Sequence, residues 1–140
     1  MTLQELNLHL ELREKLAKAQ EILGSLRRSA LPGAAKITGM PHAPGVNDKV
    51  GDLAVEIADM DARIEYLEEE IRKSESSILA FISGVDDDQA RMAFRLRFIR
   101  GLSWKEVSSV LGKYTSESSV KSACYRFLRE PDEEEHAATP

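Results

Sequence analysis

Aromatic residues, cysteine and long apolar runs are scarce in this chain of 140 residues, and each scarcity excludes a class of protein. Aromatic residues make up only 6% of the chain, too few for a large globular core. The single cysteine, Cys124, cannot form an internal disulfide and argues against a cysteine-based zinc site. The absence of long apolar runs excludes a transmembrane helix. The N-terminus has neither the basic start nor the apolar stretch of a signal peptide, so we expect a cytoplasmic protein.

What the chain does have is heptad spacing. Between residues 53 and 81 the apolar positions alternate steps of four and three, with Ser74 in the one remaining slot; they are Leu53, Ile57, Met60, Ile64, Leu67, Ile71, Ile78 and Phe81. This spacing predicts a helix from about Asn47 to Ser83 with one apolar seam. A second seam runs through Leu12, Leu16, Ala19, Leu23, Leu26 and Ala30, after a capping box at Thr2 and Glu5. We expect an all-α fold in which the two seams pair as a long antiparallel helical hairpin, a coiled-coil-like stalk, within one chain or within a dimer.

A proline- and glycine-rich segment, residues 31–48, separates the two predicted helices. It is too long for a simple helix–helix turn, and its composition suits a functional loop or a flexible spacer equally well. His42 lies in this segment near Asp48 and Asp52. One histidine without a second histidine or a cysteine nearby favours an ordinary loop residue, so we expect no metal site and no cofactor.

Three shorter helices are predicted after Ser83 and Gly84. The first follows the acidic N-cap candidates Asp86, Asp87 and Asp88, with the Asp86…Gln89 spacing of a capping box, and ends at Arg100. The second opens with the Ser103…Glu106 capping box and ends at Gly112. Thr115 or Ser116 caps the third. The predicted inward positions, in chain order, are Met92, Ala93, Leu96, Ile99, Trp104, Val107, Val110, Leu111, Val120, Cys124, Phe127 and Leu128.

Charge is distributed very unevenly along the chain. Residues 89–129 hold nine basic residues against two acidic ones, a net charge of +7, although the whole chain carries −5. The rest of the chain therefore carries −12. A basic block in an acidic chain indicates a polyanionic partner for that block.

The predicted order of helix, short turn and helix within a basic segment is typical of a helix-turn-helix. In such a motif the last helix reads DNA. The small hydroxyl and basic side chains on the outer face of that helix suit close approach to base edges and phosphates. The predicted DNA-binding residues are Ser116, Ser118, Ser119, Lys121, Ser122, Tyr125, Arg126 and Arg129.

Two stretches resemble known families. The run Gly101-Leu-Ser-Trp-Lys-Glu-Val-Ser-Ser-Val-Leu-Gly112, followed by Ser119-Val-Lys-Ser-Ala-Cys-Tyr-Arg126, resembles the fourth conserved region of bacterial sigma factors, with a longer spacing between the two blocks. The run Ile37-Thr-Gly-Met-Pro-His-Ala-Pro-Gly-Val-Asn-Asp-Lys-Val-Gly-Asp52, with its flanking helices, resembles a phage and prophage family of unknown function that is similar to phage late-gene activators. The resemblance implies mobile-element origin and transcriptional control.

We therefore expect three parts: a helical hairpin stalk at 1–84 with its loop at 31–48, a sigma-like DNA-binding domain at 85–129, and an acidic disordered tail at 130–140. The expected function is a phage-type transcriptional regulator that binds double-stranded DNA and forms a homo-oligomer through the stalk, with RNA polymerase as a further candidate partner. The alternatives are a small-terminase-like DNA-packaging protein and a structural coiled-coil adaptor. No phosphate-binding loop or catalytic triad spacing is present, so we expect no enzyme activity and no membrane partner.

Overall fold

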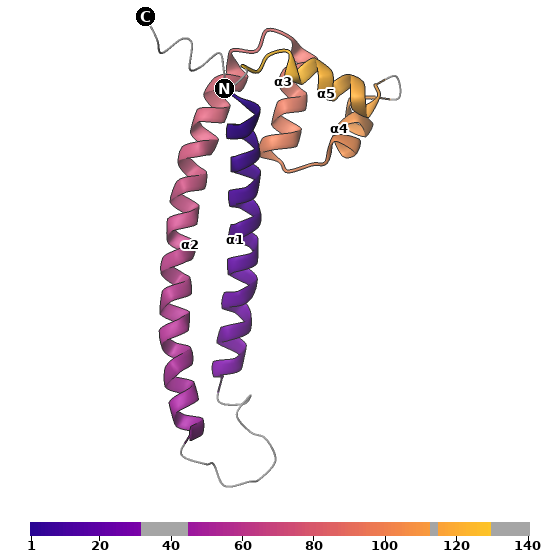
Figure 1. Cartoon of the computed structure of the whole chain (residues 1–140). Coiled ribbons are helices and arrows are strands. Elements are labelled where there is room, and N and C mark those ends of the chain that lie inside the picture. Colours follow the sequence, from indigo (N-terminus) through magenta and orange to yellow (C-terminus); the bar gives the residue numbers. More distant parts are fainter. Residues whose placement is uncertain (32–44, 113–114, 130–140) are drawn as a thin grey trace, which may run out of the picture. The chain divides into compact units, whose positions relative to one another are not determined.

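In a computed structural model the described residues are 1–31, 45–112 and 115–129, and most of them lie in helices (Figure 1). This confirms the expected all-α class. The helices are α1 (Leu3–Ala30), α2 (Gly45–Ser83), α3 (Asp88–Phe94), the π-helical turn η1 (Arg95–Ile99), α4 (Trp104–Leu111) and α5 (Glu117–Tyr125). Within these described residues no helix is long and apolar enough to cross a membrane. The expectations for loop 31–48, His42 and the tail at 130–140 concern residues that lie largely or wholly outside the described ranges.

The chain divides into two compact units, and the division differs from the predicted boundary at residue 84. The first, which we call the head unit, comprises Met1–Glu11 and Ile71–Pro140, and the second, the pair unit, comprises Leu12–Glu70. Both long helices therefore contribute to both units.

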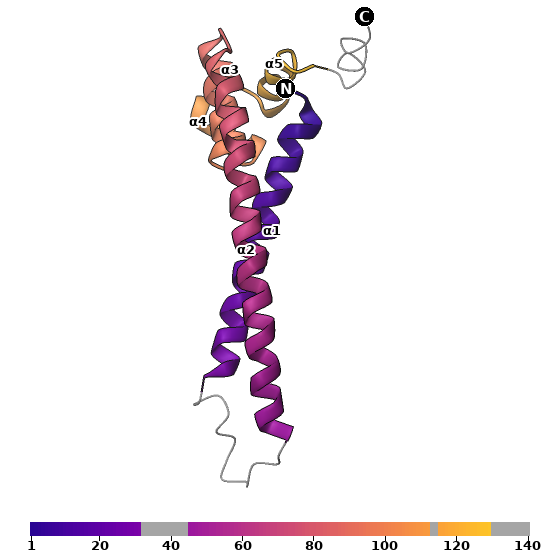
Figure 2. The ribbon, with the colours of Figure 1, turned by 90° about the vertical axis from the view of Figure 1, so that its left-hand side faces the viewer.

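The pair unit consists of the later part of α1 and the earlier part of α2, which lie side by side (Figures 1 and 2). Its core contains the buried side chains of Ala19, Ile64 and Leu67. Partly buried apolar residues pack around them, namely Leu12, Leu16, Leu23 and Met60. At the surface a salt bridge of 3.2 Å joins the Arg27 guanidinium to the Asp61 carboxylate. All these apolar residues belong to the two heptad seams.

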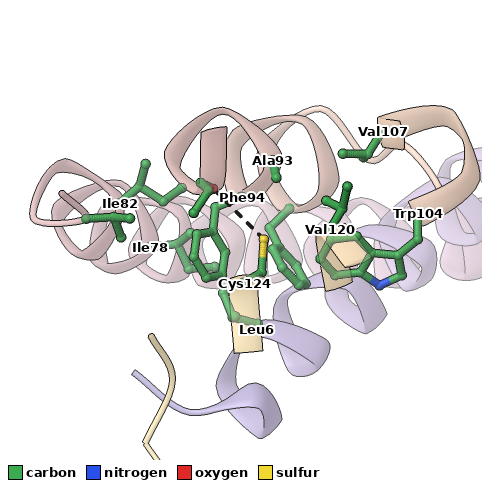
Figure 3. Packing of buried hydrophobic residues seen from close by; sticks show 12 residues of the cluster. Leu6, Ile78, Ile82, Ala93, Phe94, Trp104, Val107, Val120 and Cys124 are labelled. Carbon is green, nitrogen blue, oxygen red and sulfur yellow. Dashed lines mark hydrogen bonds between the residues drawn. The ribbon is translucent and has the colours of Figure 1, made fainter. Parts of the chain in front are cut away.

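The head unit has the larger core, and residues from both ends of the chain build it (Figure 3). Phe94 and Phe98 are almost completely buried at its centre, and the ring centroids of Phe98 and Trp104 lie 6.0 Å apart, edge to face. Leu6 from α1 and Ile78 and Ile82 from α2 are at most 2% exposed and belong to the same cluster. Because these three side chains fill the core, residues 85–129 do not close it alone.

Side-chain caps define the helix starts. At α1 the Glu5 amide donates to the Thr2 hydroxyl at 3.2 Å, and the Thr2 amide donates to the Glu5 carboxylate at 3.0 Å, as predicted. At α4 the capping box of Ser103 and Glu106 is also present. The Ser103 amide donates to the Glu106 carboxylate, and this hydrogen bond lowers the carboxyl pKa below its usual 4.5.

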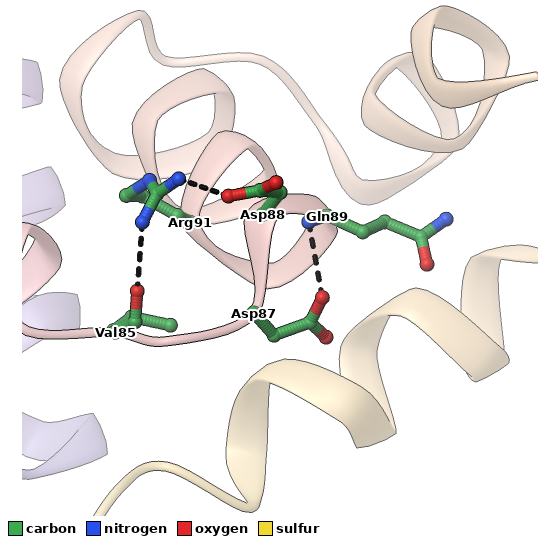
Figure 4. Close-up of polar contacts among 5 residues, drawn as sticks. All are labelled: Val85, Asp87, Asp88, Gln89 and Arg91. Atoms are coloured by element: carbon green, nitrogen blue, oxygen red, sulfur yellow. Dashed lines mark hydrogen bonds and ion pairs between the residues drawn. The ribbon is translucent and has the colours of Figure 1, made fainter.

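Of the three predicted acidic N-cap candidates, Asp87 caps α3, and the Asp86…Gln89 capping box does not form. The Asp87 carboxylate, not that of Asp86, accepts from the Gln89 amide at 3.2 Å (Figure 4). Arg91 pairs with Asp88 and donates to the Val85 carbonyl at 3.0 Å. This arrangement fixes the chain between α2 and α3.

The predicted inward faces were partly wrong. Met92 is 47% exposed and Val110 is 61% exposed, and Phe127 lies beyond the end of α5 with 38% of its surface exposed. In α3 and η1 the buried positions are Ala90, Ala93, Phe94 and Phe98, a face rotated from the predicted one. The helix face that carries Phe94 and Phe98 packs into the core, and the face that carries Met92 does not. The two aromatic rings bury more apolar surface than the Met92 side chain would.

Candidate nucleic-acid interface

The predicted recognition helix is α5. Ser116 is its N-cap, and the Ser116 hydroxyl accepts from the Ser119 amide at 3.1 Å. Five of the eight predicted DNA-binding residues lie at this cap and along the helix with exposed side chains: Ser116, Ser118, Ser119, Lys121 and Ser122. A polar, mostly small-residue surface at a helix N-terminal half can approach a groove closely.

The opposite face of α5 anchors the helix in the head unit. Val120 and Cys124 are buried there, and the Cys124 thiol lies 4.0 Å from the Ala90 carbonyl oxygen (Figure 3). Burial, with a smaller contribution from the negative charge of Asp87, raises the pKa of the Cys124 thiol to about 12. The thiol is therefore a neutral core group, as its sequence environment indicated.

The remaining three predicted residues are placed differently from the first five. Helix α5 ends at Tyr125, so Arg126 is the C-cap and Arg129 lies outside the helix. The Arg129 amide donates to the Met1 carbonyl at 3.0 Å, which ties the end of the head to the N-terminus. The Tyr125 ring packs edge to face against Trp104 at 6.1 Å, and the Lys121 ammonium lies 5.8 Å from the Tyr125 ring centroid.

A hollow of about 560 Å³ separates the end of α5 from the start of α1. Tyr125, Leu128 and Arg129 line one side of it, and residues of α1, including Leu8 and Glu11, line the other. Arg129 therefore shares this hollow with an acidic side chain. The predicted set therefore falls into two groups. Six residues lie exposed along α5 and at its two caps, and Tyr125 and Arg129 line the hollow beside α1.

Gly112 ends α4 and begins the connection to α5. Its φ of 124° lies in the region that favours glycine, so a side chain there would strain the backbone. The Thr115 amide donates to the Gly112 carbonyl at 3.1 Å, and the Gln89 side-chain amide donates to the Thr115 hydroxyl at 3.4 Å. These two bonds hold the second half of the connection against α3. Lys113 and Tyr114 lie outside the described residues.

Two of the basic residues counted in the +7 segment serve the fold itself. Arg97 donates to the Leu102 carbonyl at 2.9 Å, and its guanidinium carbon lies 5.6 Å from the Trp104 ring centroid. Arg91 is used between α2 and α3, as described above. The exposed basic side chains available to a polyanion, among the described residues of this segment, include Arg95, Arg100, Lys105, Lys121 and Arg126.

The structural role of Arg97 could not be predicted from the sequence. Its partners come from the following connection and from α4, so no local spacing in the sequence marks it. Comparison with protein-family models, curated proteins and solved structures finds no match to this chain.

Proposed function

We propose that this protein binds double-stranded DNA through α5 and regulates transcription as a phage-type, sigma-factor-like regulator in the cytoplasm of the host cell. In this proposal α4, the connection at Gly112 and α5 act as a helix-turn-helix, and α5 is the recognition helix. The α1–α2 hairpin acts as a coiled-coil-like stalk through which copies associate. RNA polymerase is a further candidate partner.

One observation carries the proposal: the outer face of the N-terminal half of α5 is exposed and polar and holds Lys121, while its opposite face is fixed in the core by Val120 and Cys124. A recognition helix needs this combination, because base-edge contacts require side chains presented from a rigid support. Lys121 stands over the Tyr125 ring at 5.8 Å, which limits the freedom of its side chain. Lys121 is therefore the side chain that we assign to base contact, with Ser118 and Ser122 beside it.

The exposed arginines and lysines of the head unit support the electrostatic part of the proposal. Each phosphate that a basic side chain neutralises releases counterions, so affinity should fall as salt rises. Arg126 follows directly on the exposed face of α5, and we assign it to a phosphate. The sequence left two alternatives open. A DNA-packaging protein would prefer a packaging site to a promoter, and a structural adaptor would bind no DNA.

The deciding experiment measures binding of the full chain to promoter duplexes, packaging-site duplexes and scrambled duplexes at several salt concentrations. Lys121→Ala should weaken binding to the preferred duplex by about 1–3 kcal/mol and relax the preference at one base position. Lys15→Ala, an exposed lysine of the pair unit, is the matched control and should have no such effect. Preference for the packaging site would favour the packaging alternative, and absence of DNA binding even at low salt would leave only the adaptor.

A further inference from the structure

One face of α1 in the pair unit combines an exposed apolar side chain with a hollow. Ile22 is 43% exposed. Beside it lies a hollow of about 360 Å³, and its described lining residues all belong to α1, namely Lys18, Glu21, Ile22, Ser25, Leu26 and Ser29. The spacing of three and four residues places all six on the same side of the helix.

The core of the pair unit is small. Among its described residues the buried apolar side chains are Ala19, Ile64 and Leu67. Helices of this kind obtain most of their stability from packing of apolar faces, and a two-helix layer buries little apolar surface for its length. A further layer on the exposed face of α1 would supply the missing burial.

We propose that a second copy of this chain packs on this face of α1, antiparallel, about a two-fold axis that passes near Ser25. The contact is isologous, so each copy offers the same knob and the same hollow. It specifies the homo-oligomer that the proposed function includes, but it does not depend on DNA binding.

Charge on this face selects the antiparallel arrangement. In a parallel pair Lys18 would lie against Lys18 of the second copy, and Glu21 against Glu21, which is repulsive. In the antiparallel pair Glu21, four residues before Ser25, lies beside Arg28 of the second copy, three residues after Ser25. The Arg28 guanidinium already donates to the Ser25 hydroxyl at 3.1 Å, and its other N–H groups can serve Glu21 of the second copy.

Side-chain size on this face also suits a second helix. Ser25 and Ser29 are small, so they permit two helix axes to approach closely. In the antiparallel register Ile22 of one copy lies beside Ser29 of the other and can enter the hollow there. Each dimer then has two such contacts, in which Ile22 of one copy fills the hollow of the other.

Cysteine cross-linking of the full chain tests the register. Ser25→Cys places a thiol at the axis, and Lys18→Cys is the matched control, also exposed on the same face. In the antiparallel pair two Lys18 positions are separated by about 21 Å along the axis, far beyond disulfide reach. After oxidation by copper(II) phenanthroline, which accepts the electrons of the two thiols, S25C should give a covalent dimer on a non-reducing gel and K18C should not. A K18C dimer would demonstrate the parallel pair, and no excess of S25C dimer over K18C would overturn the proposal.

Sedimentation equilibrium tests the face itself. Ile22→Glu should raise the dimer dissociation constant by about tenfold or more, since it puts a charge into the apolar contact. Val55→Glu on α2, where the valine is 59% exposed, is the control and should leave the constant unchanged. A wild-type chain that stays monomeric at high concentration, or an I22E chain that dimerises like wild type, would refute this contact. DNA binding is measured separately, so a dimer without DNA affinity refutes only the proposed function.

Discussion

The imidazole of His9 on α1 contacts the hydroxyl of Ser74 on α2, and His9 is only 1% exposed. Two polar side chains thus meet between the two long helices in the head unit. Ser74 occupies the one seam position that the heptad pattern did not fill with an apolar residue, and it contacts a histidine that the heptad spacing does not mark. The two side chains meet in only one register of the two helices, so their contact favours that register. Buried polar residues have this role in other helix pairs.

This contact predicts strongly non-additive mutations. Ser74→Ala should destabilise the protein by about 1–3 kcal/mol, because it removes the hydroxyl that His9 contacts in the core. The effects of His9→Leu and Ser74→Ala should not add in the double variant, since the two side chains contact each other and each single change removes that contact. Urea denaturation measures both. Ser77→Ala, whose hydroxyl donates only to the Lys73 carbonyl of its own helix in the contacts described, serves as the control. Equal effects of Ser74→Ala and Ser77→Ala would show that the buried contact contributes nothing.

Leu67 and Tyr66 are adjacent residues with opposite roles in the pair unit. Leu67 is 1% exposed in its core, whereas Tyr66 is 54% exposed. Leu67→Asp should cost about 3 kcal/mol or more, because it buries a charge among apolar side chains, and Tyr66→Asp should cost much less. Thermal melting followed by circular dichroism compares the two. Similar melting temperatures for both variants would contradict the assigned helix contact.

Cys124 predicts a decline of stability at high pH. Its thiol ionises near its usual 9.0 in the unfolded chain but only near 12 in the folded protein. Between these values the folded state binds one more proton than the unfolded state, so the free energy of unfolding falls as pH rises from about 9 to about 12. Cys124→Ala should remove this part of the slope. At neutral pH maleimide should label the wild-type thiol only as fast as the head unit opens, and immediate labelling without denaturant would show that the thiol is accessible.

The starts of α1 and α4 and the heptad seams were predictable because their determinants are local. A hydroxyl residue three positions before a glutamate marks Thr2 and Ser103 directly in the sequence, whereas the start of α5 was left open between Thr115 and Ser116. The inward faces of α3 and η1 were not predictable in the same way, because two interleaved apolar stripes compete there. Only the packed core decides that Phe94 and Phe98 are inside and Met92 is outside.

The candidate site shows the same difference. The outward positions of the serines and Lys121 were predictable from the periodicity of α5, because Val120 and Cys124 mark its inward face. The position of Arg129 beside α1 depends on Met1, whose carbonyl accepts from its amide, and no pattern near residue 129 indicates that contact. The use of Arg97 by the fold likewise depends on Trp104 in the next helix.

Arg126 and Arg129 should differ in their contribution to DNA binding. Arg126 is exposed at the end of α5, so Arg126→Ala should weaken all duplexes alike and lower the salt slope by about one. Arg129 shares its hollow with Glu11, so Arg129→Ala should lower the slope less. Affinities on specific and scrambled duplexes across a salt series measure both changes. A larger effect for Arg129 would move the phosphate contact to the hollow beside α1.

The acidic tail should oppose non-specific DNA binding. Cutting the chain after Glu130 removes Asp132 and three glutamates, so affinity for random duplexes should rise, most clearly at low salt. Removal of residues 136–140 alone, which carry no acidic side chain, is the control and should have little effect. Unchanged affinity after the longer cut would show that the tail charges do not compete with DNA.

Leu6 lies in the first turns of α1, yet it belongs to the same core as Val120 and Cys124. A ribosome releases the two ends of this core at opposite times, and Leu6 emerges long before α5 exists. Folding of the head unit must therefore bring together segments that are almost a full chain length apart, a slow step compared with local helix formation. Until α5 is complete the nascent chain exposes Leu6, Phe94 and Phe98 together, so a stalled or truncated product should be prone to aggregation.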